Sequence, residues 1–252
     1  GTGPGVQVGG MWPRKIRQGL ALLPLALVVT CDAPESRTPE PRHHHVRVGP
    51  AAPRPAIIGR SVWHADEKAV REKPAYTGAV EMVFLHHTNH SNTYDCRTDV
   101  PGMLRSMQEH HIQDMGWNDL GYNFVVDRCG NIYEGRAGGV DRPVRGAHAK
   151  GFNGRSLGIA ALGHFGSGQE VPPAMLRSIA AVTAWKLPRG VDPEGRVRMV
   201  SNNDESRFPK GKPAELRVIS GHRDEYETQC PGEALYEQIP RLRQMVARLR
   251  KK

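Results

Sequence analysis

Short, β-prone apolar runs alternate irregularly with longer helical patterns along this chain, and no strict strand–helix repeat connects them. Strand patterns cover residues 80–85, 122–127, 132–134, 157–162 and 218–220. Helical patterns cover residues 101–115, 173–187 and 231–249, the last with a break at Pro240. Residues 191–213 are polar and bounded by Pro and Gly, which predicts mainly an extended surface loop. This order predicts an α+β fold, a single domain with a central mixed β-sheet flanked by helices.

Two segments of different composition precede the expected domain at residues 56–252. In residues 1–32, basic Arg14, Lys15 and Arg17 are followed by an apolar stretch that is too short to span a bilayer. This pattern predicts an N-terminal extension and a secretory signal. Cys31 closes the stretch, and it is either cleaved away or lipidated as an anchor. Residues 33–55 are rich in Pro, Arg and His without apolar periodicity, which predicts a linker.

The chain is strongly basic, with a formal net charge of +9 and an isoelectric point near 9.6. Such a surface attracts polyanions, which include nucleic acids, anionic membranes and acidic wall polymers. The sequence contains no zinc-finger, helix-turn-helix or aromatic-basic motif, and the export signal argues against a nucleic-acid partner. We therefore expect no nucleic acid as a partner, and anionic wall polymers as an additional one.

Three cysteines remain in the exported part of the chain, Cys96, Cys129 and Cys230. Three is an odd number, so at least one thiol is unpaired within the chain, and the sequence alone allows three pairings. Cys230 lies eight residues after His222, whereas the other two have no histidine nearby in sequence. We therefore expect a Cys96–Cys129 disulfide and a Cys230 thiol that is free to bind metal. A closed loop of about 33 residues would stabilise the fold by roughly 3–4 kcal/mol.

His222 and Cys230 together suggest a zinc site, because zinc takes tetrahedral nitrogen and sulfur ligands. Their spacing does not place them on one helix face, so the loop between them has to curl. The best candidate for a third ligand is the pair His86–His87 at the end of a strand pattern. The alternative is a structural thiol with ordinary surface histidines.

Six motifs in this chain resemble the peptidoglycan recognition protein and type 2 N-acetylmuramoyl-L-alanine amidase family. They follow the order of that family over residues 57–249, and the likeness is greatest to the secreted actinobacterial members. The six motifs are VFLHHT (83–88), GWNDLGYNF (116–124), IYEGR (132–136), GAH (146–148), SLGI (156–159) and GHRD through CPG (221–232). The resemblance implies a zinc-dependent enzyme that hydrolyses the amide bond between the lactyl group of N-acetylmuramic acid and L-alanine in peptidoglycan.

The resemblance also implies roles for individual residues. The zinc ligands would be His86, His222 and Cys230. Tyr122 would lie beside the reacting water, and Thr228, where a phage member has Lys, would stabilise developing negative charge. His87 would face away or line the site. Without the resemblance, Tyr122 would be interpreted as a core aromatic residue on a strand.

Several further residues would bind the substrate if the resemblance holds. Arg136 can grip a stem-peptide carboxylate through a bidentate pair. Gly116 and Trp117 form a Gly-Trp pair, and in similar recognition proteins such a pair at this position accompanies a preference for diaminopimelate-type peptides. His148 and Lys150 could bind the sugar–lactyl end or another carboxylate. The alternatives are a surface ion pair for Arg136, core packing for Trp117, a buried structural role for His148 and a solvated charge for Lys150.

The rival function is a recognition module that binds peptidoglycan without cutting it. In this family, members that do not cut commonly replace the ligand cysteine with serine. Cys230 is present here with His86, His222 and Tyr122, so we expect an active hydrolase. We further expect a monomer that is secreted and associated with the cell wall.

Overall fold

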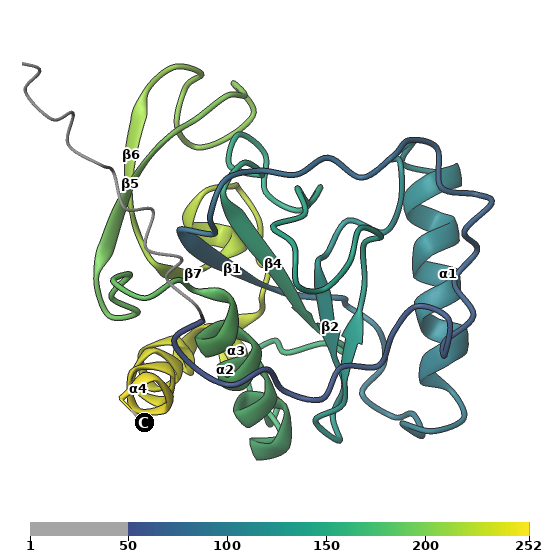
Figure 1. The fold of residues 1–252 in the computed structure, drawn as a ribbon. Helices are drawn as coiled ribbons and strands as arrows, with labels where there is room; N and C mark the ends of the chain where they lie inside the picture. Colours follow the sequence, from purple (N-terminus) through teal and green to yellow (C-terminus); the bar gives the residue numbers. More distant parts are fainter. Residues whose placement is uncertain (1–49, 252) are drawn as a thin grey trace, which may run out of the picture. The chain divides into compact units, whose positions relative to one another are not determined.

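The computed structural model describes residues 50–251, which build a central sheet with helices on both faces (Figure 1). The predicted signal segment, Cys31 and most of the predicted linker lie outside these residues. No helix within residues 50–251 has the length and apolarity needed to cross a membrane. The expected α+β fold with a mixed central sheet is confirmed.

Within the described part of the chain, the main sheet has five strands in the order β3-β2-β4-β1-β7. Strand β1 pairs in parallel with β4 and β7, β2 is parallel to β4, and only β3 is antiparallel to its neighbour β2. The sheet is therefore mixed, with β1 and β4 buried at its centre. The strands are β1 (Met82–His87), β2 (Phe124–Val126), β3 (Ile132–Glu134), β4 (Ser156–Ala161) and β7 (Ile219–Gly221).

Alternating side chains of the sheet contact different layers. In β1, Val83 and Leu85 belong to the core shared with α2 (Pro173–Lys186) and α4 (Ile239–Arg250). Phe84 and Met82 point the other way, into a separate cluster. Burial on both faces is typical of central parallel strands. This alternation decides which of two neighbouring residues at a strand end reaches a given face of the sheet.

Helix α1 (Val100–Gln113) covers the sheet face opposite α2 and α4 (Figure 1). Its residues Leu104 and Met107 pack with Trp63 and with Val125 of β2. Helix α1 begins at Val100 with Pro101 in its first turn. Proline is tolerated there because N–H groups in the first turn have no intrahelical acceptor. The helix predicted at residues 101–115 is thus present.

The predicted surface loop at residues 191–213 is wrong in part, because it contains a strand. Strand β5 (Arg196–Val200) pairs antiparallel with β6 (Pro213–Arg217) as a separate hairpin. Met199, Ala214 and Leu216 are buried against Phe84 and its neighbours. Only one face of this hairpin is covered, so its strands contain many polar residues and lack the apolar run of a central strand.

The last helical region divides two residues earlier than predicted. A short helix α3 (Glu233–Glu237) is followed by α4, and Pro240 lies in the first turn of α4. Proline is accepted there because the first helical N–H groups have no intrahelical acceptor.

The end of the predicted linker also packs on the domain, since Pro50 bridges to Pro188 and Ala52 is buried in the core.

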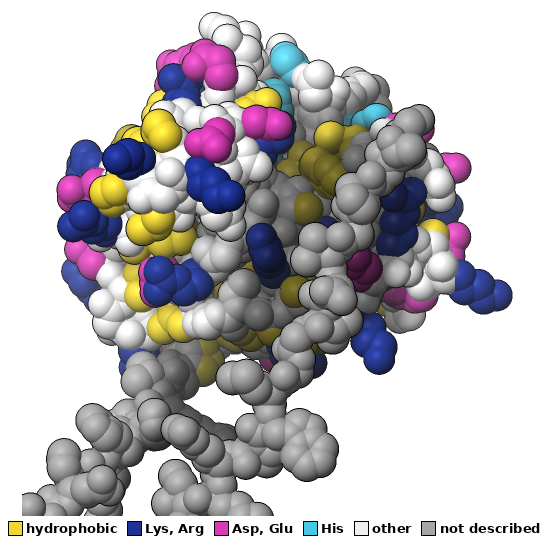
Figure 2. Space-filling model, turned by 90° about the horizontal axis from the view of Figure 1, so that it is seen from above, with side chains coloured by type: hydrophobic (Ala, Val, Ile, Leu, Met, Phe, Trp, Pro, Cys, Tyr) yellow, Lys and Arg dark blue, Asp and Glu magenta, His cyan; other side chains and the backbone are white. Residues whose placement is uncertain are grey.

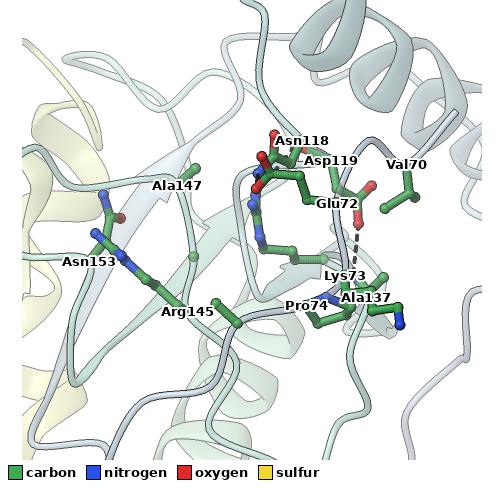
Figure 3. Close-up of a pocket in the computed structure, with 13 residues that line it drawn as sticks. Val70, Glu72, Lys73, Pro74, Asn118, Asp119, Ala137, Arg145, Ala147 and Asn153 are labelled. Carbon is green, nitrogen blue, oxygen red and sulfur yellow. Dashed lines mark hydrogen bonds between the residues drawn. The ribbon is translucent and has the colours of Figure 1, made fainter.

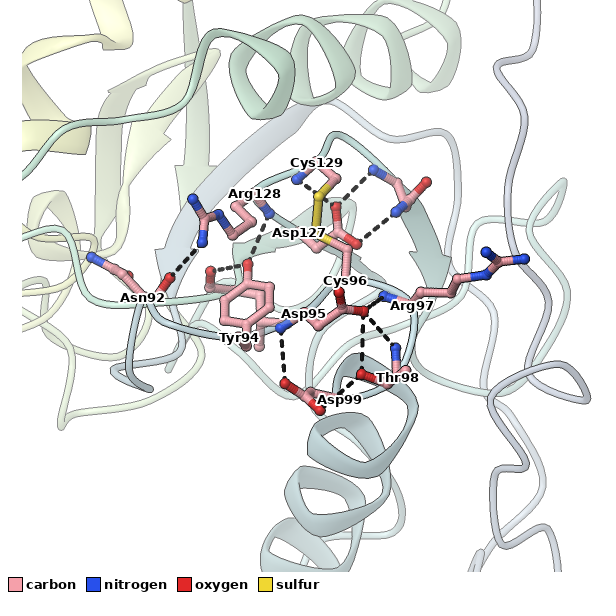
Figure 4. The surroundings of a disulfide bond; sticks show 12 residues. Asn92, Tyr94, Asp95, Cys96, Arg97, Thr98, Asp99, Asp127, Arg128 and Cys129 are labelled. Carbon is pink, nitrogen blue, oxygen red and sulfur yellow. Dashed lines mark hydrogen bonds between the residues drawn. A yellow bond between two sulfur atoms is a disulfide. The ribbon is translucent and has the colours of Figure 1, made fainter.

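The expected disulfide between Cys96 and Cys129 is present and joins the turn before α1 to the β2–β3 turn (Figure 4). Buried Asp127 organises the latter turn, because its carboxylate accepts hydrogen bonds from the backbone N–H groups of Cys129 and Asn131 and from the Tyr133 hydroxyl. The disulfide therefore connects two segments that are separated by 33 residues in sequence.

We expect the double substitution Cys96→Ala, Cys129→Ala to lower the free energy of unfolding by about 3–4 kcal/mol, because the open chain gains loop entropy when it unfolds. Denaturant titration of the two proteins measures this difference. Addition of reductant to the wild-type chain should reproduce the loss, and it should change nothing in the double variant. An unchanged unfolding midpoint in the double variant would contradict the expectation.

Candidate metal centre

Strands β1 and β7 end side by side, and each delivers a histidine at its carboxyl end. Leu85 pairs with Gly221 in parallel register, so that His86 and His222 follow next to each other. Their ring centroids are 4.5 Å apart. The carboxyl ends of parallel strands are where open sheets commonly place their ligands. The topology thus brings together two residues that are far apart in sequence.

Strand alternation separates the roles of His86 and His87. The His86 ring lies on the same sheet face as Phe84, whereas His87 lies on the face of Leu85. The Phe165 backbone N–H donates a 3.3 Å hydrogen bond to Nδ1 of His87. His87 therefore points away from the His86 ring, and only its backbone contacts the Cys230 sulfur, through the N–H at 3.4 Å and the carbonyl oxygen at 4.0 Å.

The loop from His222 to Cys230 curls back as the sequence predicts. It starts in a 3-10 turn (His222–Asp224), and the Arg223 N–H then donates to the Cys230 carbonyl at 3.0 Å. Thr228 supports the return, because its hydroxyl accepts a 3.2 Å hydrogen bond from the Cys230 N–H. Thr228 is only partly buried, and its own hydroxyl proton remains available for donation.

His86, His222 and Cys230 offer ligand atoms that all lie within 4.8 Å of one another. The Cys230 sulfur is 3.7 Å from Nδ1 of His86. Tetrahedral zinc, with its usual bond lengths to sulfur and nitrogen, requires a separation of about 3.6 Å between two such ligand atoms. The residues present therefore fit a zinc ion without rearrangement of this pair.

The electrostatic environment of the three ligands also favours a bound cation. His86 is 1% exposed, and burial, together with His222 and His148, holds its pKa well below the ordinary value. Burial raises the pKa of the Cys230 thiol to about 12. Neutral imidazoles are ready metal ligands, and a coordinating cation is what turns a buried thiol into a thiolate.

His148 lies behind His86 and does not face open solvent. Its Nδ1 is 3.2 Å from Nε2 of His86, and its ring is 5% exposed. Gly146 and Gly158 leave the room for this ring, since a Cβ atom at either position would overlap it. The contact leaves Nδ1 of His86 for the metal, so the structure supports the buried position that the sequence left as an alternative for His148.

Glu225 is a residue that the sequence analysis missed. Its carboxylate is completely buried, with Oε1 3.3 Å from Nε2 of His222. Burial raises the pKa of Glu225, while His222 and the Lys150 backbone act against this increase. An acidic residue three positions after a ligand histidine was the available signal, although the same spacing is common on ordinary surfaces.

Tyr122 lies next to the ligands, with its ring centroid 5.1 Å from that of His86. Burial and the nearby Cys230 raise the pKa of its hydroxyl, so the hydroxyl keeps its proton at neutral pH. Tyr122 also borders a cavity of about 240 Å³ that α1 lines with His110 and His111. The predicted catalytic side chain thus lies next to the candidate metal ligands.

Arg136 lines a second cavity, of about 290 Å³ (Figure 3). Its Nη1 donates to the Leu120 carbonyl at 3.1 Å, which holds the guanidinium in place. Arg145 and Asn153 lie on one side of the cavity, with Asp119 on the other. None of the candidate metal ligands His86, His222 and Cys230 lines this cavity, so Arg136 would contact a part of a substrate away from the candidate metal site.

The other predicted substrate residues are placed differently. Trp117 is partly buried against His111, at 4.7 Å between ring centroids, and next to Gly121, while Gly116 is exposed. Lys150 forms an ion pair with Glu205 and is therefore not a free cation. A contact between Lys150 and a substrate carboxylate stays a prediction, and it would require the ion pair with Glu205 to break.

The surface seen in Figure 2 mixes lysine and arginine with acidic side chains. The positive charges on this face do not form one continuous field. A compact polyanion would therefore meet both signs of charge on this side of the molecule.

The chain matches a family described as N-acetylmuramoyl-L-alanine amidase over residues 76–233. Peptidoglycan-recognition protein SC2 of Drosophila simulans is 28% identical over 183 residues, which cover 73% of this chain and 84% of that protein. An N-acetylmuramoyl-L-alanine amidase of Sus scrofa is 32% identical over 188 residues, which cover 73% of this chain and 27% of that protein.

A solved structure of peptidoglycan recognition protein LE in complex with tracheal cytotoxin, a monomeric diaminopimelic acid-type peptidoglycan, has a similar fold. Its TM-score is 0.55 at 31% identity, and the match covers 74% of this chain and 93% of that one. The matched family region spans well over half of this chain and includes all three candidate ligands. The chain therefore belongs to the N-acetylmuramoyl-L-alanine amidase family, together with the peptidoglycan recognition proteins, as the sequence motifs predict.

Proposed function

We propose that this chain is a zinc-dependent N-acetylmuramoyl-L-alanine amidase that hydrolyses the amide bond between the lactyl group and L-alanine of peptidoglycan. The observation that carries the proposal is the convergence of His86, His222 and Cys230 within 4.8 Å, with Tyr122 beside them. When bound, zinc would lower the pKa of a water molecule enough to supply a hydroxide nucleophile at neutral pH, and it would polarise the amide carbonyl.

The protein's own residues would orient the reactants and stabilise charge. The Tyr122 hydroxyl, which keeps its proton, would donate a hydrogen bond toward the oxygen that becomes negative. Thr228 holds the Cys230 backbone with its oxygen and could use its proton for the same purpose. His148 would keep the His86 ring in one tautomer and orientation.

The second candidate function is recognition of peptidoglycan without hydrolysis, since relatives of this chain include recognition proteins. Cys230 favours hydrolysis, because its sulfur completes the set of ligands. A catalytic zinc site needs three protein ligands and one open position. The set of three here supports an enzyme over a recognition module.

We propose diaminopimelate-type stem peptides as the substrate. The LE recognition protein was solved with such a ligand, and Arg136 lines a cavity that would accept a carboxylate. Cleavage would take place outside the cytoplasm, at the cell wall, where peptidoglycan lies. The Cys96–Cys129 disulfide supports this location, because disulfides persist in oxidising compartments.

We expect Arg136→Gln to raise KM for diaminopimelate-type substrates roughly tenfold to a hundredfold, because a lost charge-assisted hydrogen bond costs about 1.5–3 kcal/mol. Steady-state kinetics on soluble muropeptides measures this effect. Arg136→Lys should recover only part of the loss, since lysine lacks the planar fork. Zinc affinity should stay unchanged in both variants, and an unchanged KM in Arg136→Gln would remove Arg136 from the substrate site.

Removal and return of zinc test the proposed function. The chelated protein should release no soluble fragments from peptidoglycan, and stoichiometric zinc should restore their release. Magnesium, which prefers oxygen ligands, should not restore it. Full release by the metal-free protein, or binding without release after zinc is returned, would contradict the proposal.

A further inference from the structure

Glu225 is a buried acid in direct contact with a candidate metal ligand. Its side chain is 0% exposed, and Oε1 lies 3.3 Å from Nε2 of His222. The His222 Nε2 and the Lys150 backbone N–H face this carboxylate, but neither carboxylate oxygen has a hydrogen bond of good geometry within residues 50–251. A buried carboxylate in this condition is costly unless a positive charge compensates it.

The hairpin of β5 and β6 holds Glu225 in this place. The Ser206 hydroxyl and the Arg207 N–H both donate to the Glu225 carbonyl, at 3.0 and 2.8 Å. Next to it, the Tyr226 ring stacks on the His222 ring with an interplanar angle of 14° and a centroid distance of 5.5 Å. The loop that follows β5 thus fixes the backbone that carries the carboxylate.

We propose that Glu225 is a positioning residue that fixes His222 with Nδ1 directed toward the metal. The inference rests on the proposed zinc site. With metal bound at Nδ1, the 3.3 Å contact between Nε2 and Oε1 would close to a hydrogen bond. A carboxylate that accepts the Nε2 proton of a ligand histidine sets its tautomer, restrains its ring and increases its basicity. Glu225 itself cannot touch the substrate, because it is fully buried behind His222.

Charge balance gives the same assignment. A zinc dication with the Cys230 thiolate and two neutral imidazoles leaves one net positive charge in a buried site. The Glu225 carboxylate would neutralise that charge at the distance of one imidazole ring. The metal would in turn compensate the carboxylate, which otherwise lacks well-formed hydrogen bonds.

Glu227 offers a matched control in the same loop. It is also a glutamate, but its side chain is 85% exposed and it pairs with Arg207 at 3.0 Å. Substitution of Glu227 by glutamine therefore removes the same charge at a similar sequence distance from His222 without touching the ligand. A general effect of lost negative charge would appear in both variants.

The experiment measures the zinc affinity of the full-length chain and its variants by competition with a chromophoric chelator. We expect Glu225→Gln to bind zinc about 10–100-fold more weakly than wild type, and Glu227→Gln to bind it with wild-type affinity. Cobalt substitution adds a spectroscopic readout, in which the visible absorption bands should change in Glu225→Gln alone. Melting of the zinc-free proteins reports any separate effect on folding.

Unchanged zinc affinity and cobalt spectrum in Glu225→Gln would overturn the inference, even if the zinc-free variant melts at a lower temperature. If Glu225→Gln does not fold, Glu225→Asp, which keeps the charge but is one methylene shorter, takes its place. A loss of zinc affinity of about threefold or more is then expected, and wild-type affinity overturns the inference. A wild-type chain that binds no zinc would instead contradict the proposed function, and the inference with it.

Discussion

Cys230→Ser is expected to weaken zinc binding by roughly a thousandfold or more and to abolish hydrolysis, because a neutral hydroxyl replaces the thiolate. The Cys230 sulfur lies 3.7 Å from Nδ1 of His86, and the whole residue is only 9% exposed. Zinc titration and release of soluble peptidoglycan fragments measure the two effects.

The double variant Cys96→Ala, Cys129→Ala is the matched control for this substitution. It removes two cysteines that are joined to each other and lie outside the candidate metal site. It should be less stable but should keep its zinc affinity and its activity at a temperature at which it is folded. Cys230→Ser should still bind peptidoglycan, because the cavity of Arg136 is not lined by Cys230. Wild-type rates of cleavage by Cys230→Ser would show that Cys230 is not required for hydrolysis.

Tyr122→Phe is expected to lower kcat by about 10²–10³, the usual effect of removing one hydrogen-bond donor to a developing oxyanion. The phenylalanine ring should keep the packing against His86 and His111. Zinc affinity and the melting temperature should therefore change little. Kinetics of zinc-loaded protein on soluble muropeptides measures the effect.

Tyr94→Phe controls for the loss of a tyrosine hydroxyl elsewhere in the domain. The Tyr94 hydroxyl donates to the Leu162 carbonyl at 2.9 Å and accepts from the Arg128 N–H at 2.8 Å. Its removal should cost about 1 kcal/mol of stability for each hydrogen bond and leave kcat unchanged. Equal kcat values for Tyr122→Phe and wild type would show that the Tyr122 hydroxyl takes no part in the reaction.

The sheet and its helices could be predicted because their residues are buried in a regular pattern. Strand β1 is apolar on both faces, and α1 carries its core residues at helical spacing. The hairpin of β5 and β6 was missed because one face is exposed, so its charged residues resembled those of a loop. Periodicity predicts elements in the core better than elements that cover its edge.

The candidate ligands were predictable to different degrees. His222 and Cys230 share one loop, so their proximity could be expected from the sequence. The choice of His86 over His87 came from the family resemblance, and the structure supplies the physical reason, since the two rings lie on opposite faces of β1. The disulfide prediction is confirmed by the bond between Cys96 and Cys129.

The contacts that Lys150 and Glu225 make with the loop after β5 could not be predicted. Lys150 pairs with Glu205 from the loop after β5, and Glu225 is buried beneath the same loop. Both contacts depend on how the β5–β6 hairpin folds back over the site, which no local pattern encodes. In the sequence alone, Glu225 therefore cannot be distinguished from an exposed acidic residue.

The most direct test of the central claim is the identity of the products from diaminopimelate-type peptidoglycan. The zinc-loaded chain is incubated with purified sacculi, and the soluble fraction is analysed by mass spectrometry. The account predicts free stem peptides that begin with L-alanine, together with glycan strands whose lactyl carboxylates are uncovered. Peptidoglycan that is bound but remains uncut by the zinc-loaded chain would contradict the account and identify a recognition protein instead.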